Sequence, residues 1–168
     1  MIIMKRLFLL LAVMFVAVSA AHGQKKSEYH AEWDAGVDII SPLEGFLLPT
    51  IHTVHGVRFS DRVFVGGGIG VSCESSDSIF MPIYANVKCF FAIKKEKRPF
   101  LSFDIGYSAF LAGSSDYDMA GLYISPAFGL KYKRFKFQVG YMAQQIRWSI
   151  TRKAEFYSAG HVRFGMMF

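Results

Sequence analysis

The run Gly66-Gly67-Gly68-Ile69-Gly70 is the stretch of this sequence that most resembles a nucleotide-binding loop. Such a loop needs glycine at its first, third and sixth positions, just before a helix, so that backbone N–H groups can approach the phosphates. Here the sixth position is Val71, and no helical pattern follows. We therefore interpret the glycines as small residues that relieve crowding where a sheet bends, and we predict no cofactor site.

Two histidines, His52 and His55, come nearest to a metal-binding pair. Their spacing of three places them on opposite faces of a strand, so they cannot bind one ion together without a bulge. No other His, Cys, Asp or Glu completes a ligand spacing, and no catalytic set is expected. Cys73 and Cys89 are interpreted as apolar fillers, because a hairpin turning near residues 74–78 would not place them opposite each other.

Charged residues instead alternate with apolar ones, which indicates that β-strands position them. In the segment 29–40, His30, Glu32, Asp34, Gly36 and Asp38 alternate with Tyr29, Ala31, Trp33, Ala35, Val37 and Ile39. A period of two residues is typical of a strand with two different faces. The C-terminus has the same period, and its apolar positions are Val162, Phe164, Met166 and Phe168.

The whole sequence contains eight segments of this kind. Besides 29–40 and the C-terminal strand, they are 51–59, 63–73, 80–93, 100–111, 122–132 and 137–144. Short, charged connections at 60–62, 94–98 and 133–134 alternate with mostly longer ones at 41–50, 74–78, 113–119 and 145–155. Short turns on one side and long loops on the other, with both termini on the short side, are typical of outer-membrane barrels.

The composition and the N-terminus favour an exported membrane protein. Lys5 and Arg6 precede an apolar run from Leu7 to Val18 and then small residues, so residues 1–23 are predicted to be a cleaved signal peptide and 24–168 the mature domain. The chain is 52% hydrophobic, 16% aromatic and 19% charged. Because no later run is long enough for a membrane helix, a closed β-barrel is the remaining way to span a bilayer. The net charge of +6 is scattered, and no nucleic acid is expected as a partner.

The volume of the side chains predicts which face points outward. The lumen of an eight-stranded barrel is only wide enough for side chains to fill. The apolar faces carry too many aromatic rings for that space, whereas the opposite faces are rich in glycine and carry the charges. The sequence therefore predicts an all-β, eight-stranded antiparallel up-and-down transmembrane barrel. Its predicted lumen charge cluster is Glu32, Asp34, Lys88, Asp104, Lys131, His161 and Arg163.

With these features, the sequence resembles the small eight-stranded outer-membrane barrels of Gram-negative bacteria, the OmpA/OmpX type. The resemblance covers the whole mature chain, and the segments "HGVRF" and "FVGGGIGV" are similar to a hairpin of barrels described only as porin-like. It implies that the C-terminal residues Val162, Phe164, Met166 and Phe168 are the assembly signal read by the barrel-insertion machinery. It also implies outer-membrane localisation, but members of this architecture have unrelated activities.

Three functions are compatible with such a barrel. The first is a non-catalytic structural or surface-interaction scaffold with a packed polar lumen, expected to be a monomer. The second is a lipid A-modifying acyltransferase or deacylase, for which the rim residues Ser75, Ser76, Ser114, Ser115 and His52 would be candidates without a tight motif. The third is a soluble periplasmic ligand-binding barrel of the lipocalin kind. We favour the first, because charges in the lumen leave no apolar pocket for an acyl chain.

Two predicted outer loops supply candidate surface contacts. Phe46 and Leu47 in "SPLEGFLLPT" are more apolar than a solvated loop requires. Arg147, Trp148 and Arg152 in "QQIRWSITRK" suit the phosphates of lipopolysaccharide. Outer-membrane lipid and lipopolysaccharide are therefore the expected partners.

The first and last strands must pair to close the barrel. Setting Ala31 opposite Met166 would place Asp34 opposite Arg163, with Glu32 and His161 flanking them. A register slip of two residues would keep the same faces. We hypothesise an Asp34–Arg163 ion pair at this seam.

Overall fold

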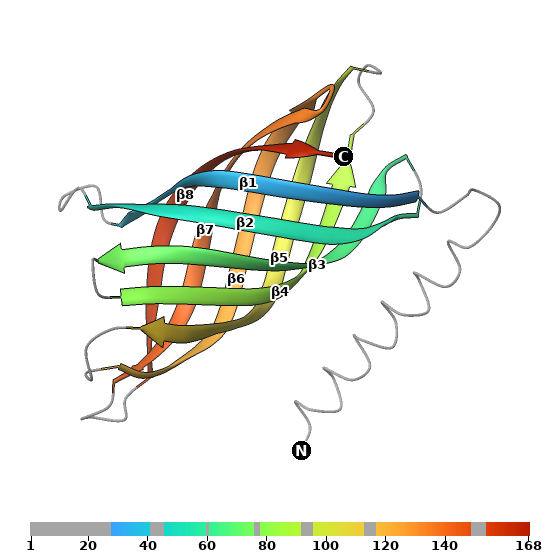
Figure 1. The fold of residues 1–168 in the computed structure, drawn as a ribbon. Coiled ribbons are helices and arrows are strands. Elements are labelled where there is room, and N and C mark those ends of the chain that lie inside the picture. The colour runs from blue at the N-terminus through green and yellow to red at the C-terminus, as the bar shows by residue number, and fades with distance from the viewer. Residues whose placement is uncertain are drawn as a thin grey trace.

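The computed structural model describes residues 28–40, 46–59, 61–75, 78–91, 96–112, 117–148 and 154–168. They form eight strands: β1 (Glu28–Ile40), β2 (Phe46–Arg58), β3 (Val63–Ser75), β4 (Ser78–Phe90), β5 (Lys97–Ala112), β6 (Tyr117–Tyr132), β7 (Phe135–Trp148) and β8 (Ala154–Met167). Each strand pairs antiparallel with the next, and β1 pairs with β8, so the sheet closes. Strands on the near and far walls cross steeply (Figure 1), as the tilt of a closed barrel requires. The predicted all-β, eight-stranded antiparallel barrel is confirmed.

In the described part of the chain, no helix is long and apolar enough to cross a membrane.

The barrel has two rims that we name by their connections. The terminal rim carries the start of β1, the end of β8 and the connections 59–62, 91–96 and 133–134. The opposite rim carries the connections 41–45, 76–77, 113–116 and 149–153, whose residues lie outside the described ranges. The sequence predicts shorter connections at the terminal rim than at the opposite rim. This prediction is wrong, because the strands continue into the predicted loops of the opposite rim. Leu48, for example, pairs with Asp38 and is buried.

The alternation of the strands separates a polar lumen from an apolar outer wall. Large apolar side chains project outward, as shown by the exposed fractions of Ile51 (64%) and Phe128 (53%). The charged side chains of Glu32, Lys88 and Arg163 are at most 2% exposed and lie inside. The predicted orientation of the two faces is therefore confirmed.

The register of the closing seam differs from the prediction by two residues. Trp33 lies opposite Met166, Asp34 opposite Gly165, and Gly36 opposite Arg163. The predicted Asp34–Arg163 pair is therefore wrong. The alternation of faces does not distinguish registers that differ by two. In this register Asp34 fits beside Gly165, where a Cβ would lie 2.2 Å from its Oδ1 atom.

The terminal residue completes the seam. The backbone N–H of Phe168 donates to the carbonyl oxygen of Ala31 over 2.8 Å, and the N–H of Ala31 donates to the carbonyl oxygen of Phe168 over 3.2 Å. Nδ1 of His30 lies 3.0 Å from that same carbonyl oxygen. The last residue is thus an integral part of the closed hydrogen-bonded wall.

The glycine run of β3 leaves room for large lumen side chains. A Cβ on Gly68 would lie 2.4 Å from the ring of Tyr84, and a Cβ on Gly70 would lie 2.3 Å from the ring of His52. Both rings therefore occupy the space that a side chain at position 68 or 70 would need. This agrees with the interpretation of these glycines as small lumen residues.

Candidate functional site

Four charged side chains from three separate strands meet in the lumen, and we call them the lumen ion cluster. Glu32 on β1 accepts hydrogen bonds from Lys88 on β4, over 2.5 Å, and from Lys136 on β7. Lys136 also lies 2.8 Å from a carboxylate oxygen of Asp34. Because β1, β4 and β7 are not neighbours in the sheet, the cluster joins distant parts of the wall across the lumen. Ions removed from water in this way are stable only when they are paired.

Asp104 is held by neighbouring amide and hydroxyl groups. The side-chain amide of Asn86 donates to a carboxylate oxygen of Asp104 and to the hydroxyl of Ser102, the latter over 2.9 Å. Asn86 and Asp104 are direct partners in the β4–β5 ladder and are both buried. The side-chain interaction therefore adds to the backbone pairing of these strands.

Arg163 and two tyrosines form a second polar layer. An Nη atom of Arg163 lies 3.6 Å from a carboxylate oxygen of Asp38 and 3.4 Å from the hydroxyl of Tyr123. The ring centroids of Tyr123 and Tyr84 are 5.6 Å apart, and the Tyr84 hydroxyl is 3.1 Å from Nδ1 of His52. The layer is thus a network of aromatic and charged groups that connects β8 with β1, β2, β4 and β6.

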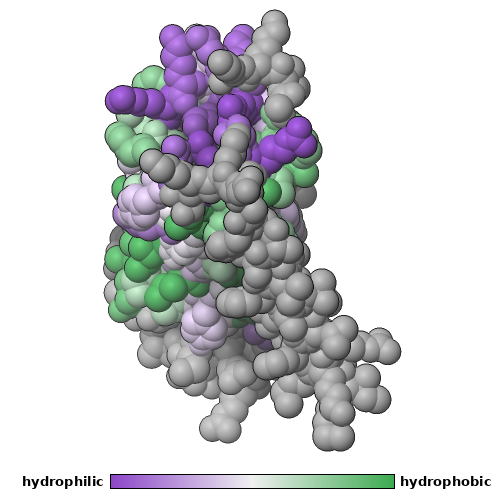
Figure 2. Space-filling view, turned by 90° about the vertical axis from the view of Figure 1, so that its right-hand side faces the viewer, coloured by the Kyte–Doolittle hydropathy of each residue, from purple (hydrophilic) through white to green (hydrophobic). Residues whose placement is uncertain are grey.

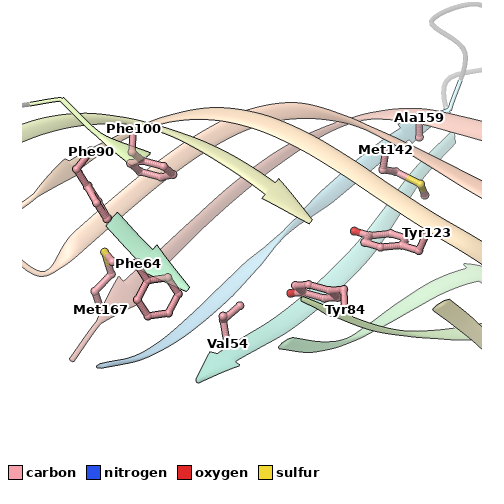
Figure 3. Packing of buried hydrophobic residues seen from close by; sticks show 9 residues of the cluster. All are labelled: Val54, Phe64, Tyr84, Phe90, Phe100, Tyr123, Met142, Ala159 and Met167. Atoms are coloured by element: carbon pink, nitrogen blue, oxygen red, sulfur yellow. The ribbon is translucent and has the colours of Figure 1, made fainter. Parts of the chain in front are cut away.

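An apolar layer lies near the terminal rim (Figure 3). Phe64, Phe90, Phe100 and Met167 are buried there, with the Phe90 and Phe100 ring centroids 5.5 Å apart. The ammonium of Lys88 lies 5.3 Å from the ring centroid of Phe64, which connects this layer to the ion cluster. The lumen therefore contains stacked apolar and polar layers.

Some of the predicted site residues meet in these layers and others do not. Glu32, Asp34 and Lys88 belong to one cluster, whereas Arg163 pairs with Asp38. His161 is buried, and neither of its ring nitrogens has a hydrogen-bond partner among the described residues. Asp104 is buried beside Asn86, and Lys131 is only half-buried and lies near the terminal rim.

Sequence reasoning missed Lys136 and Asp38 as members of the lumen network, and it missed the buried phenylalanines. The alternation predicts Asp38 on the inner face but does not predict its contact with Arg163. Lys136 and Phe64 occupy inward positions of the period-two pattern in β7 and β3. That pattern identifies Asp38 and Phe64 as inward-facing, but Lys136 precedes the predicted seventh strand, which begins at residue 137.

The other predicted residues lie on the outer wall or beyond the described ranges. Of the four residues of the assembly signal, Phe164 and Phe168 are exposed, and Val162 and Met166 are partly exposed. Of the predicted surface contacts, Leu47 is an exposed residue of β2; Phe46, Arg147 and Trp148 are strand residues whose side chains are not described, and Arg152 lies outside the described residues. These are corrections to the predicted loops, since only Arg152 lies in a connection.

The histidines and cysteines singled out in the sequence lie in separate parts of the barrel. His52 and His161 face the lumen, whereas His55 faces outward, where its Nδ1 atom is 2.6 Å from the Tyr29 hydroxyl. Within the described residues, no group of three His, Cys, Asp or Glu side chains is arranged to hold a metal ion. Cys73 and Cys89 are free thiols.

Two apolar grooves lined by described residues lie on the outer wall. One of about 520 Å³ crosses β4 to β7 and includes Leu101, Phe103, Pro126, Phe128 and Tyr141. The other, of about 350 Å³, lies near the terminal rim across β6, β7 and β8. Both volumes are within the range of small-molecule sites.

No family model and no curated protein sequence matches this chain. Among solved structures, the chain is similar to the neisserial surface protein A (NspA), with a TM-score of 0.61, 15% identity, and coverage of 85% of this chain and 98% of that one. It is also similar to the N-terminal β-barrel domain of OprF from Pseudomonas aeruginosa, with a TM-score of 0.52, 15% identity, and coverage of 85% and 100%. A de novo designed transmembrane β-barrel gives a TM-score of 0.54 at 11% identity, with coverage of 86% and 97%. These similarities confirm, at the level of the fold, the resemblance to small outer-membrane barrels.

Proposed function

We propose that this protein is an integral outer-membrane β-barrel that acts as a non-catalytic structural or surface-interaction scaffold. The observation that carries the proposal is the distribution of side chains between wall and lumen. Phe103, Phe128, Phe137 and Phe164 each expose between 45% and 53% of their surface, whereas the charges of the ion cluster are buried. A soluble protein rarely exposes so continuous an apolar surface.

A bilayer would surround the apolar side chains of this outer wall, and the closed sheet would satisfy the backbone hydrogen-bonding groups. In a hydrocarbon environment every backbone N–H and C=O group must find a partner within the protein, and a closed sheet provides one. The strands contain 13 to 16 residues, which is more than the roughly 9–11 residues that a tilted strand needs to span a membrane. The exposed tyrosines, tryptophan and phenylalanines near the terminal rim, Tyr29, Trp33, Phe91, Tyr132 and Phe168, suit one interfacial girdle.

The lumen gives little support to the two alternative functions. A lipocalin-like barrel or a lipid A-modifying acyltransferase would need an apolar cavity inside the barrel. Here the interior contains ion pairs, aromatic rings and the Arg163 network, and the two grooves described above are on the outer wall. The proposed partners are therefore outer-membrane lipid, lipopolysaccharide at the opposite rim, and the barrel-insertion machinery during assembly.

The proposal predicts that the protein fractionates with the outer membrane and migrates differently on a gel before and after boiling. A folded barrel resists detergent, so the unboiled form runs as a compact species. A sample found in the soluble periplasmic fraction, with no change on boiling, would contradict both the membrane placement and the barrel scaffold.

Deletion of Phe168 is predicted to reduce the amount of protein in the outer membrane strongly while leaving most of the barrel able to fold in detergent. The residue provides two seam hydrogen bonds and an exposed terminal ring. Phe168→Ala keeps the backbone bonds and removes only the ring. If the ring is part of the assembly signal, both variants should be depleted in a fractionation experiment. Wild-type levels of Phe168→Ala would show that the ring is not read during assembly.

A further inference from the structure

Three exposed cations lie on the terminal rim beside β6 and β7, near Glu96, whose backbone carbonyl oxygen accepts a hydrogen bond from the N–H of Lys133. Lys97, Lys133 and Arg134 are exposed, and none forms an ion pair with a carboxylate of the described residues. Figure 2 shows hydrophilic residues gathered at the top of one face, with hydrophobic residues on the wall below them. The hairpin between β6 and β7 stands at the same end of the molecule in Figure 1.

Two of these cations lie over one outward-facing ring. The ammonium of Lys97 is 5.9 Å from the ring centroid of Tyr132, and that of Lys133 is 5.5 Å from it. Lys97 is the direct ladder partner of Tyr132, and Lys133 follows Tyr132 in the turn. The contacts place both positive charges at the outer wall, at the edge of its apolar surface.

The smaller groove of the outer wall contains the same tyrosine. Its outward-facing residues are Leu130, Tyr132, Phe135, Phe137 and Phe164, which expose between 42% and 51% of their surface. The rings of Phe135 and Phe164 stack with centroids 5.7 Å apart and form part of its floor. The groove is therefore apolar and has two cations at its upper edge.

We propose that this surface binds an anionic phospholipid of the leaflet at the terminal rim. The headgroup phosphate would lie at Lys97 and Lys133, with Arg134 nearby, and one acyl chain would lie in the groove. Lysine is a common phosphate ligand, and long cationic side chains near a membrane interface extend toward the headgroups. The inference rests on the proposed membrane placement, because only a bilayer brings both parts of the ligand to this wall.

The charge pattern favours an anionic lipid over a zwitterionic one. A phosphatidylcholine headgroup carries a positive group that would oppose the three unpaired cations. Each Lys or Arg near an anionic membrane surface contributes a factor of about five in affinity. Removing both lysines should therefore weaken binding of phosphatidylglycerol about twenty-five-fold.

The test uses the mature barrel refolded in detergent, titrated separately with phosphatidylglycerol and phosphatidylcholine, with bound lipids counted by native mass spectrometry. Wild type should retain phosphatidylglycerol preferentially, and Lys97→Gln/Lys133→Gln should lose that preference. Leu130→Trp, which fills the groove without changing the charge, should also reduce retention. The control for Lys133→Gln is Arg62→Gln. This variant also removes one positive charge, but from the β2–β3 connection on the other side of the barrel.

Each outcome decides the proposal. Equal retention of the two lipids by wild type, or an equal loss in Lys133→Gln and Arg62→Gln, would overturn it. If inorganic phosphate at millimolar concentration displaced the lipid completely, the groove would contribute nothing and the two-part site would be wrong. Migration before and after boiling, measured on the same samples, separates these results from failure of the barrel itself.

Discussion

Replacing Glu32 with methionine is expected to lower the free energy of unfolding by about 3–5 kcal/mol, the cost of leaving a buried ion without its partner. The carboxylate of Glu32 accepts hydrogen bonds from both Lys88 and Lys136. After the substitution Lys136 keeps Asp34 at 2.8 Å, whereas Lys88 loses the carboxylate that contacts it directly and keeps its contact with the Phe64 ring. The loss of the direct ion pair of Lys88 is therefore expected to be the main source of the lower stability.

A double-mutant cycle separates this pairing from simple loss of packing. Lys88→Met should cost less than Glu32→Met, because Glu32 still has Lys136. The double variant Glu32→Met/Lys88→Met should be more stable than Glu32→Met alone, since it removes both charges and leaves the Lys136–Asp34 pair intact. Replacing the exposed Glu28 by glutamine is the control, with an expected change within about 0.5 kcal/mol.

The measurement is urea-induced unfolding of the barrel refolded into lipid vesicles, followed by tryptophan fluorescence. Additive costs for Glu32→Met and Lys88→Met would show that the two side chains do not interact in the folded protein. Such a result would also contradict the placement of Glu32 on β1 opposite Lys88 on β4 across the lumen, on which the ion cluster depends.

The architecture could be predicted from the sequence because it rests on alternation, which is a local property. The strand from Glu28 to Ile40 alternates so regularly that its two faces can be assigned by inspection. Side-chain volume then decides which face is outward, because an eight-stranded lumen cannot hold the rings of Trp33, Phe103, Phe128 and their neighbours. Assigning the two faces needs only neighbouring residues, and deciding which face is outward needs only the number of strands and the volume of the side chains.

The partners inside the lumen could not be predicted in the same way. The sequence predicts that Arg163 pairs with Asp34. In the structure Arg163 lies near Asp38, because registers that differ by two residues keep the same faces. Lys136 reaches Glu32 across the lumen, between strands that are not paired. Such contacts depend on strand tilt and stagger around the whole barrel, which no single segment of sequence specifies.

Glycines in the strands determine where large side chains can fit inside the lumen. Gly106 on β5 pairs with Tyr84 on one side and with Tyr123 on the other. The ring centroids of these two tyrosines are 5.6 Å apart. The absence of a side chain at position 106 thus provides space for the aromatic contact that supports the Arg163 network.

Gly106→Ala is therefore expected to destabilise the barrel by about 3 kcal/mol, the upper part of the usual range for overpacking. A Cβ at this position would lie 2.0 Å from the carbonyl oxygen of Ile83 and 2.5 Å from Cα of Tyr84. Because both atoms belong to the backbone, the β4–β5 pairing itself would have to shift. A rotamer change of one side chain cannot relieve the contact.

Two other glycines provide graded controls for this prediction. Gly68→Ala should cost about 1–2 kcal/mol, because its Cβ would meet the end of the Tyr84 ring, which can move. Gly67→Ala, which points outward with its nearest neighbour 4.0 Å away, should change stability by no more than about 0.5 kcal/mol. Urea unfolding in vesicles would measure all three variants. Equal losses at positions 67 and 106 would mean that backbone flexibility, and not space beside Tyr84, is what these strands require from glycine.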